Sequence, residues 1–390
     1  MLNPLLFQDD IARICDSPEA AQHGNELINH VMESKLLDFN LDKSVYIVIG
    51  RQFVRQNLEK KLEETPLTLA GYPMKTTIQE KYLGDQLHQL GNQDSVLATV
   101  KARYGQVLAA IQEIRSVIED CRSNVVGGIT AGIDIWEISV IPFLLANSST
   151  WSEVPKSAIK LLDNLQNTFY RYLLAAPRST PIPALLWETG GLIMMSRIHL
   201  RKLLFYHHLL SLDDSSVASK VARVATQAGY PGLVQEYEQL RKLYNLPCAR
   251  QTSKQRWKKL VNTAITDGNR VQLLDEVKAK FNKLDYNILK DERYEMKEYM
   301  KILNMSNARV KFRIRTKMVE NIAFNFSSDN KYANQLWQCT HCSNIDSQSH
   351  VLVCVGFKHL REGKDLKSDK DLVSYFRDVI SLRDQMDNLV

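Results

Sequence analysis

The sequence predicts a mainly α-helical protein with a small α+β portion at its N-terminus. From Asp94 onward apolar residues recur at helical spacing, whereas Val45 to Ile49 is a short β-branched run typical of a strand. Cysteine and histidine residues cluster near the C-terminus and predict a separate small element there. The 390 residues, 44% hydrophobic and 24% charged, are enough for two or three globular domains.

The first element, Leu5 to Ala12, is predicted to be a strand, a tight turn and a second strand, with Asp9 and Asp10 at the turn. Two ionised carboxylates in one tight turn require a counter-charge, and a divalent cation with oxygen ligands commonly provides it. The alternative is a solvated Asp-Asp turn without a metal. These residues alone leave both interpretations open.

Several more elements are predicted before residue 90. They are a helix from Ala20 to Leu37, a buried strand from Val45 to Ile49, a charged helix from Gln52 to Glu64, and a hairpin from Leu67 to Lys75 with Gly71 and Pro73 at its bend. In this order the segment resembles the palm of a reverse transcriptase of the LINE-type, non-LTR retrotransposon family. Three motifs carry the resemblance: Phe7-Gln8-Asp9-Asp10 is similar to the family's aromatic-x-Asp-Asp motif, Lys43-Ser44 to its next motif, and Tyr82-Leu83-Gly84 to its primer-grip hairpin.

The resemblance implies that Asp9 and Asp10 are catalytic ligands for magnesium in a site where two metal ions assist nucleotide addition. In the family another aspartate and the nucleotide-binding fingers precede this motif, whereas Met1 lies directly before it here. We therefore expect an incomplete metal site, magnesium binding only if the missing palm is supplied, and no polymerase activity from the chain alone. The missing N-terminal part of the polymerase would be a partner.

The next segment is predicted to be helical from Ser95, as the N-cap, to Cys121, from Ala131 to Leu145, and from Trp151 to Ala176. The resemblance implies that these helices form the thumb, with Lys101, Arg103 and Arg115 as candidates for phosphate contacts. Tryptophan side chains in this region and just beyond it are interpreted as packing residues; they are Trp136, Trp151 and Trp187.

A proline-containing linker, Pro177 to Pro183, joins the first helices to the apolar helical run Ala184 to Leu212. His199, His207 and His208 lie in this run, but residues 189 to 212 contain no cysteine, aspartate or glutamate that could complete a metal site. We interpret these histidines as packed residues rather than metal ligands.

Positive charge is concentrated late in the chain. Residues 250 to 317 contain 18 Lys and Arg against 8 Asp and Glu, a local charge of +10, although the whole chain carries only +6. Such a segment indicates a polyanionic partner, and the alternative is a solvated helical surface. The candidate nucleic-acid-binding residues are Lys254, Arg256, Lys258, Lys259, Arg309, Lys311, Arg313, Arg315 and Lys317.

Two local patterns indicate how these candidate residues are arranged. Trp257 could stack on a base, but its spacing to Val261 and Ile265 favours a buried helical stripe with the cations on the solvent side. Residues 309 to 317 alternate basic and apolar residues, which fits a strand, but the flanking sequence favours a helix capped by Ser306. Either geometry gives a dense cationic element whose affinity for a polyanion depends strongly on salt.

The most specific motif is Cys339-x2-Cys342-x7-His350-x3-Cys354. Four thiolate and imidazole ligands from one short segment are typical of a structural zinc site, and no position remains for a catalytic water. His341, inside the first pair, is interpreted as a bystander. In the resembled family a Cys-Cys-His-Cys knuckle also follows the thumb and linker.

The segment after the knuckle ends in a predicted helix from Asp369 to Met386. Some relatives carry an endonuclease at this position, but about thirty residues are too few for such a fold. The acidic residues of this helix are therefore interpreted as a solvated face.

These expectations give five segments: a partial reverse-transcriptase palm (1–90), a helical thumb (91–176), a helical basic linker (177–325), a zinc knuckle (326–360) and a C-terminal helix (361–390). The expected function is that of a truncated reverse transcriptase that binds RNA and DNA but is inactive alone. The alternatives are a host-adopted, zinc-containing nucleic-acid-binding protein and a helical interaction protein without catalysis. We expect an intracellular protein, in nucleus or cytoplasm, with no signal peptide or transmembrane segment.

Overall fold

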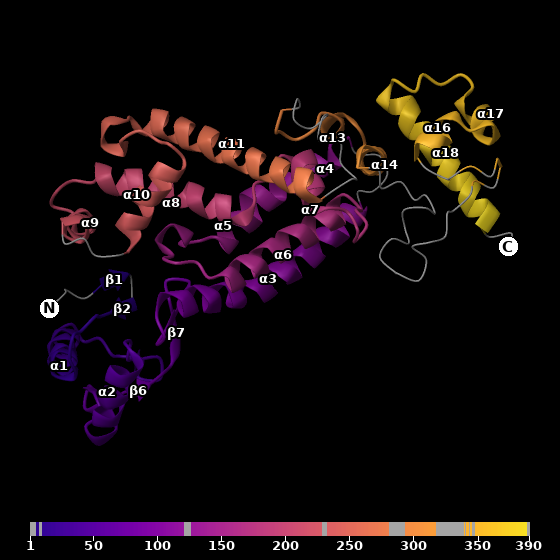
Figure 1. The fold of residues 1–390 in the computed structure, drawn as a ribbon. Coiled ribbons are helices and arrows are strands. Elements are labelled where there is room, and N and C mark those ends of the chain that lie inside the picture. The colour runs from indigo at the N-terminus through magenta and orange to yellow at the C-terminus, as the bar shows by residue number, and fades with distance from the viewer. Residues whose placement is uncertain are drawn as a thin grey trace. The chain divides into compact units, whose positions relative to one another are not determined.

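The computed structural model describes residues 5–7, 10–120, 126–227, 232–280, 293–316, 339, 341, 342, 344 and 348–387. These residues are mainly helical and include four two-stranded sheets, all before residue 90 (Figure 1). The predicted fold class, mainly α with a small α+β portion, is confirmed. The chain divides into two compact units, one of residues 1–102 with 151–158 and the other of residues 103–150 with 159–390.

The first hairpin of the N-terminal unit joins β1 (Leu5–Phe7) to β2 (Asp10–Ala12) in antiparallel register, with Phe7 opposite Asp10. The structure places Asp10 at the start of β2, where it is exposed, rather than in the turn. Asp9 lies outside the described residues.

Helix α1 (Pro18–Ser34) begins two residues before the predicted start, because the Ser17 side chain accepts a hydrogen bond from the Ala20 N–H at 3.1 Å. Helix α2 (Gln52–Glu64) has the predicted bounds. The strand expected from Val45 to Ile49 is shorter: β3 (Val45–Tyr46) pairs in parallel with the equally short β6 (Lys75–Thr76), so its partner limits its length.

Two further hairpins have two-residue loops. β4 (Thr68–Leu69) and β5 (Tyr72–Pro73) are joined by Ala70 and Gly71, so Pro73 lies in a strand rather than at the predicted bend. β7 (Gln79–Tyr82) and β8 (Asp85–His88) are joined by Leu83 and Gly84, with φ of 47° and 87°. Left-handed conformations at both loop positions define the tight turn that matches the twist of a hairpin. The Tyr82-Leu83-Gly84 motif therefore occupies a hairpin turn.

Helix α3 (Asn92–Asp120) contributes to both units. It begins before Ser95, so Ser95 is not its N-cap; the Ser95 hydroxyl instead donates to the Gly91 carbonyl at 2.8 Å and accepts from the His88 N–H at 2.9 Å. The following elements are α4 (Gly128–Ile135), the π-helix η1 (Trp136–Val140), α5 (Ile141–Leu144), η2 (Ser148–Thr150) and α6 (Lys156–Leu173).

The C-terminal unit continues with α7 (Ile182–Thr189), α8 (Met194–Ser211), α9 (Val217–Gln227), α10 (Leu233–Leu243), η3 (Ala249–Gln251), α11 (Lys254–Lys280), α13 (Tyr299–Ile302) and α14 (Met305–Arg315). Its last elements are α16 (Gln348–Val353), η4 (Val355–Phe357), α17 (Lys358–Arg361) and α18 (Asp369–Asp387). None of the helices in the described ranges is both long and apolar enough to cross a lipid bilayer.

The predicted packing role of the tryptophans is confirmed. Trp136, Trp151, Trp187 and Trp257 are at most 4% exposed. Trp136 stacks on Phe169 with ring centroids 4.5 Å apart. Trp257 belongs to a core cluster formed by α8, α10, η3 and α11, and Figure 1 shows α11 running alongside α8. These contacts fix which side of α11 faces solvent.

Candidate metal centre and cationic surfaces

The structure brings the four residues of the Cys-Cys-His-Cys motif together. The three Sγ atoms and the imidazole nitrogen lie within 4.8 Å of one another. The Sγ atom of Cys354 is 3.7 Å from that of Cys339 and 3.7 Å from that of Cys342, and Cys342 Sγ is 3.2 Å from His350 Nε2. This cluster can hold a metal ion, as the motif predicted.

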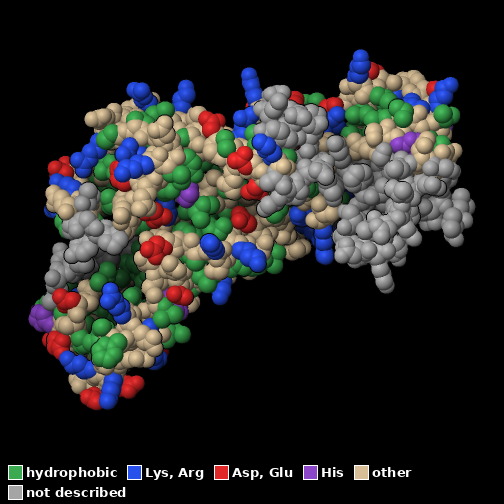
Figure 2. Space-filling model, in the orientation of Figure 1, with side chains coloured by type: hydrophobic (Ala, Val, Ile, Leu, Met, Phe, Trp, Pro, Cys, Tyr) green, Lys and Arg blue, Asp and Glu red, His purple; other side chains and the backbone are tan. Residues whose placement is uncertain are grey.

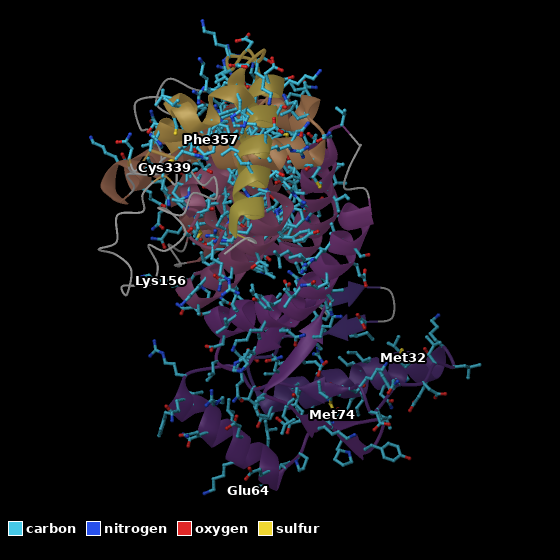
Figure 3. All side chains as sticks on the ribbon, turned by 90° about the vertical axis from the view of Figure 1, so that its right-hand side faces the viewer. Met32, Glu64, Met74, Lys156, Cys339 and Phe357 are labelled. Carbon is cyan, nitrogen blue, oxygen red and sulfur yellow. The ribbon has the colours of Figure 1, made fainter. Side chains whose placement is uncertain are left out.

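Local backbone structure creates this cluster. A turn closes around the first pair, because the Cys339 N–H donates to the Asn344 carbonyl at 2.7 Å. His350 lies on α16 and Cys354 follows it by four residues, so one helical turn brings both ligands to the same side. Cys339 and Cys354 are 4% and 3% exposed, and Figure 3 shows Cys339 close to Phe357 of the same core cluster.

His341 has a packing role. Its ring meets Phe357 edge-on, with centroids 5.0 Å apart. Gly356 permits this approach, since a Cβ atom there would lie 2.3 Å from Cγ of His341. The bystander interpretation of His341 agrees with this packing.

The protonation of the thiols links metal binding to pH. Burial raises the pKa of Cys339 to about 11, whereas the hydrogen bond from the Asn344 backbone lowers the pKa of Cys342. A thiol with a pKa of about 11 is protonated near neutral pH, and a metal ion must displace that proton in order to bind. Metal binding at this cluster therefore releases protons and weakens as the pH falls.

A second candidate site is the α11 cationic surface, which we define as Lys254, Arg256, Lys258 and Lys259. All four side chains are exposed, and in the described part of the chain none has an ion-pair partner. The buried stripe of the same helix, Trp257 with Val261 and Ile265, faces the core, and the Trp257 indole N–H donates to the Leu203 carbonyl at 2.9 Å. The predicted division into a buried tryptophan and solvent-facing cations is confirmed.

The surroundings of this surface strengthen its positive potential. Residues 239 to 262 contain seven Lys and Arg and no Asp or Glu, and of these Arg241 pairs with Glu238 at 2.8 Å. Figure 2 shows Lys and Arg side chains projecting where α10 and the first turns of α11 lie. The first turns of a helix carry a partial positive charge that favours anions and disfavours cations. Four cations in the first six residues of α11 are thus unfavourable for the helix by itself.

The cations of α14 have a different environment. The segment is helical as predicted, but its N-cap is Asn304, whose side chain accepts from the Asn307 N–H at 2.9 Å, and not Ser306. Arg309 donates a hydrogen bond to the Leu173 carbonyl at 2.9 Å, and Arg313 donates one to the Ala175 carbonyl at 3.0 Å. Both guanidinium groups therefore provide donors for carbonyls at the end of α6, where intrahelical donors are missing.

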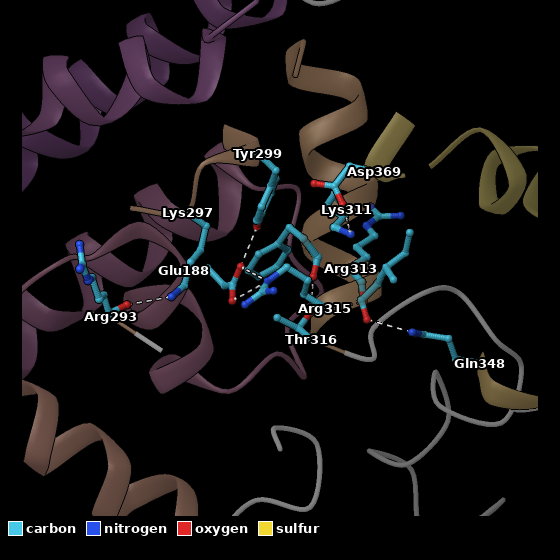
Figure 4. Close-up of polar contacts among 12 residues, drawn as sticks. Glu188, Arg293, Lys297, Tyr299, Lys311, Arg313, Arg315, Thr316, Gln348 and Asp369 are labelled. Atoms are coloured by element: carbon cyan, nitrogen blue, oxygen red, sulfur yellow. Dashed lines mark hydrogen bonds and ion pairs between the residues drawn. The ribbon is translucent and has the colours of Figure 1, made fainter. Parts of the chain in front are cut away.

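The other two described cations of α14 form ion pairs. Arg315 Nε lies 2.8 Å from a carboxylate oxygen of Glu188, and Lys311 Nζ lies 2.6 Å from Oδ1 of Asp369 (Figure 4). Arg309, Lys311, Arg313 and Arg315 are all half-buried in contacts within the chain, and Lys317 lies outside the described residues. Because of these contacts we do not assign the α14 cations to nucleic acid.

Arg103 also differs from its expected role. It is 6% exposed and donates to the carbonyls of Leu144 at 3.2 Å and Ala146 at 2.8 Å. A guanidinium in this position supports the chain after α5 and is not accessible to phosphate. Arg115 packs over the ring of Tyr172 at 5.0 Å.

Sequence reasoning missed the ion pair of Glu137 and Arg197. Two bonds of 2.6 Å join the guanidinium to the carboxylate, and Arg197 also donates to Gln166 Oε1 at 3.2 Å and to the Leu192 carbonyl at 3.1 Å. Glu137 lies in the π-helix η1. The sequence offered one signal for this pair, because Glu137 and Arg197 are charged residues within apolar helical runs. It does not show that the two side chains meet.

His199 and His207 of α8 are packed, as predicted, whereas His208 in the last turn of the helix is exposed, so the prediction is wrong for that residue. His199 Nδ1 lies 2.9 Å from the Tyr244 hydroxyl, and His207 Nε2 lies 2.8 Å from the Thr252 carbonyl. Burial lowers the pKa of His199 to about 4, below its ordinary value of about 6.5. Between these two values an unfolded chain binds a proton at this residue whereas the folded chain does not.

We therefore expect the free energy of unfolding to fall as the pH is lowered from about 6.5 to about 4, and His199→Gln to reduce this dependence. Urea unfolding of both proteins at several pH values across this window measures the effect. Other titrating groups contribute equally to both proteins, so the difference isolates His199. Identical pH dependence in the two proteins would contradict the assignment.

Comparisons of the chain with protein-family models, with curated proteins and with solved structures found no match. The metal cluster and the α11 cationic surface are the two features of the described residues that indicate a function.

Proposed function

We propose that this protein binds nucleic acid through the α11 cationic surface and holds a structural zinc ion at Cys339, Cys342, His350 and Cys354. The single observation that carries the proposal is the group of exposed cations at the start of α11, which lies on a helix fixed by its buried side and in a stretch, residues 239 to 262, without Asp or Glu. Because cations destabilise this end of a helix, their concentration there favours a role in binding an anionic partner.

The donor set and its spacing favour zinc among the metals. Three thiols with one imidazole are a common zinc combination, and tetrahedral coordination with Zn–S distances of about 2.3 Å places sulfur atoms about 3.8 Å apart. The two distances of 3.7 Å from the Cys354 sulfur agree with this value. All four positions are filled by protein ligands, so the proposed role of zinc is structural.

We further propose that the chain corresponds to the C-terminal portion of a non-LTR retrotransposon reverse transcriptase. Support comes from the order of the quoted motifs and from the hairpins that hold two of them, β1 with β2 and β7 with β8. The proposed partners are RNA and DNA. The primer-grip role of Tyr82, Leu83 and Gly84 and the catalytic role of Asp9 and Asp10 belong to this proposal, as does magnesium supplied with a complete palm.

Binding by the α11 cationic surface can be tested with a variant in which Lys254, Arg256, Lys258 and Lys259 are all replaced by glutamine. We expect affinity for a labelled DNA duplex to fall at least tenfold near 0.1 M salt. The slope of log affinity against log salt should decrease in magnitude by about 3 to 4, because each phosphate contact contributes about 0.9. Fluorescence anisotropy at four or five salt concentrations, with duplex DNA and with single-stranded RNA, measures both quantities.

The control removes the same charge elsewhere: Lys35, Arg51, Lys60 and Lys81, which are exposed residues of the N-terminal unit, are replaced by glutamine. This variant should keep most of the affinity. An equal loss in both variants would show that net charge, and not the α11 cationic surface, determines binding. Absence of binding by the unaltered protein to either nucleic acid would reject the function and favour an interaction protein.

A further inference from the structure

Helix α14 has two different packing faces. On one face Arg309 and Arg313 donate to carbonyls at the end of α6. Arg315, which lies on a different side of the helix, pairs with Glu188 of α7. Glu188 is 2% exposed and also accepts a hydrogen bond from the Tyr299 hydroxyl at 2.9 Å. These three arginines fix α14 to the helices before it.

The other face of α14 belongs to the core of the metal-binding segment. Ile314 shares one buried cluster with the metal ligands Cys339 and Cys354 and with Phe357. The Ile314 carbonyl accepts a hydrogen bond from Gln348 at the start of α16, at 2.9 Å (Figure 4). Lys311 pairs with Asp369 at the start of α18, so α14 also contacts the helix that covers this core.

We infer that α14 couples metal occupancy to the attachment of the metal-binding segment to the rest of the C-terminal unit. Metal ligation fixes Cys339 and Cys354, which form part of the surface on which Ile314 packs. Loss of the metal removes the constraint on that surface and thereby weakens the packing that holds α14 in place. The arginine contacts to α6 and α7 weaken with it, because they depend on the position of the whole helix.

The coupling must be reciprocal. If metal binding strengthens the packing of α14, then strengthening the packing of α14 must raise the affinity for metal by the same free energy. Weakening the arginine face of α14 should therefore lower the affinity of the cluster for metal. This inference rests on the proposed metal occupancy and is independent of nucleic-acid binding.

Hydrogen exchange of the full chain, measured with zinc bound and after its removal by a chelator, tests the coupling. We expect exchange in residues 305–315 to accelerate about tenfold, a factor in the range of typical couplings between sites. Residues 254–280 serve as the internal reference, because α11 packs in a separate core cluster with α8 and α10. Their exchange should change little. Zinc content is determined first, so failure of metal binding is distinguished from failure of the coupling.

The reciprocal measurement compares zinc affinities by competition with a chromogenic chelator. The double variant Arg309→Met with Arg313→Met should bind zinc several-fold more weakly, whereas the control Arg256→Met, on the exposed side of α11, should not. If the double variant does not fold, the exchange experiment on the unaltered chain still decides. Unchanged exchange in residues 305–315, or equal acceleration in residues 254–280, would overturn the inference.

Discussion

Replacement of a buried residue of the candidate metal cluster, Cys354→Ala, is expected to abolish the proposed stoichiometric zinc binding and to unfold the C-terminal segment that contains the cluster. Cys354 lies at the centre of the cluster, with its sulfur 3.7 Å from each of the other two sulfurs, and it belongs to the core that includes Phe357. Zinc binding to small structural sites is worth about 10–16 kcal/mol near neutral pH and supplies much of their folding free energy. Removing one ligand should therefore affect both properties together.

Zinc content per chain by mass spectrometry under native conditions, with proteolysis of the same samples, measures the two effects. We expect one zinc per chain in the unaltered protein and nearly none in Cys354→Ala, with cleavage appearing after residue 339. Cys248→Ala is the matched control, because Cys248 is an exposed free cysteine outside the cluster. Retention of one tightly bound zinc in Cys354→Ala would exclude this residue as a ligand.

Removal of Glu137, the partly exposed partner of the buried Arg197, by Glu137→Ala is expected to destabilise the C-terminal unit by about 2–3 kcal/mol. This is less than for a fully buried pair, because the Glu137 side chain is 36% exposed. Its partner Arg197 has a side chain that is only 7% exposed, and its charge would lose both 2.6 Å bonds to the carboxylate. The remaining acceptors, Gln166 and the Leu192 carbonyl, are neutral and cannot replace the lost charge. Denaturant unfolding monitored by circular dichroism measures the change.

Two further variants separate the ion pair from its surroundings. Glu298→Ala removes an exposed pair, with Lys301 and Glu298 side chains 48% and 69% exposed, and should cost at most about 1 kcal/mol. The apolar double replacement, Glu137→Leu with Arg197→Met, should recover much of the stability lost in Glu137→Ala, because no buried charge remains without a partner. An equal loss of unfolding free energy in Glu137→Ala and Glu298→Ala would show that groups other than Glu137 stabilise the charge of Arg197.

Several local features could be predicted from the sequence because they depend on neighbouring residues alone. The metal cluster follows from two close ligand pairs, one closed by a turn and the other by one turn of α16. The buried stripe of α11 follows from helical periodicity, which places Trp257, Val261 and Ile265 on one side. Details of helix ends were less predictable. Ser95 and Ser306 have suitable side chains, yet α3 begins before Ser95 and Asn304 caps α14.

The roles of individual charged residues were decided by tertiary structure. Helical spacing placed Arg309 and Arg313 on one stripe, but their acceptors are backbone carbonyls at the end of α6, about 140 residues earlier. A backbone carbonyl is common to every residue and leaves no signal in the sequence. Lys258, with the same side-chain charge as Lys311, faces solvent because the buried stripe of α11 turns toward the core, whereas Lys311 meets Asp369. The sequence by itself determined the mainly helical class, the residues of the candidate metal cluster and the cationic composition, because these depend on composition and local spacing. Only the folded chain decided which cations remain available to a partner, because that depends on which distant groups lie beside them after packing.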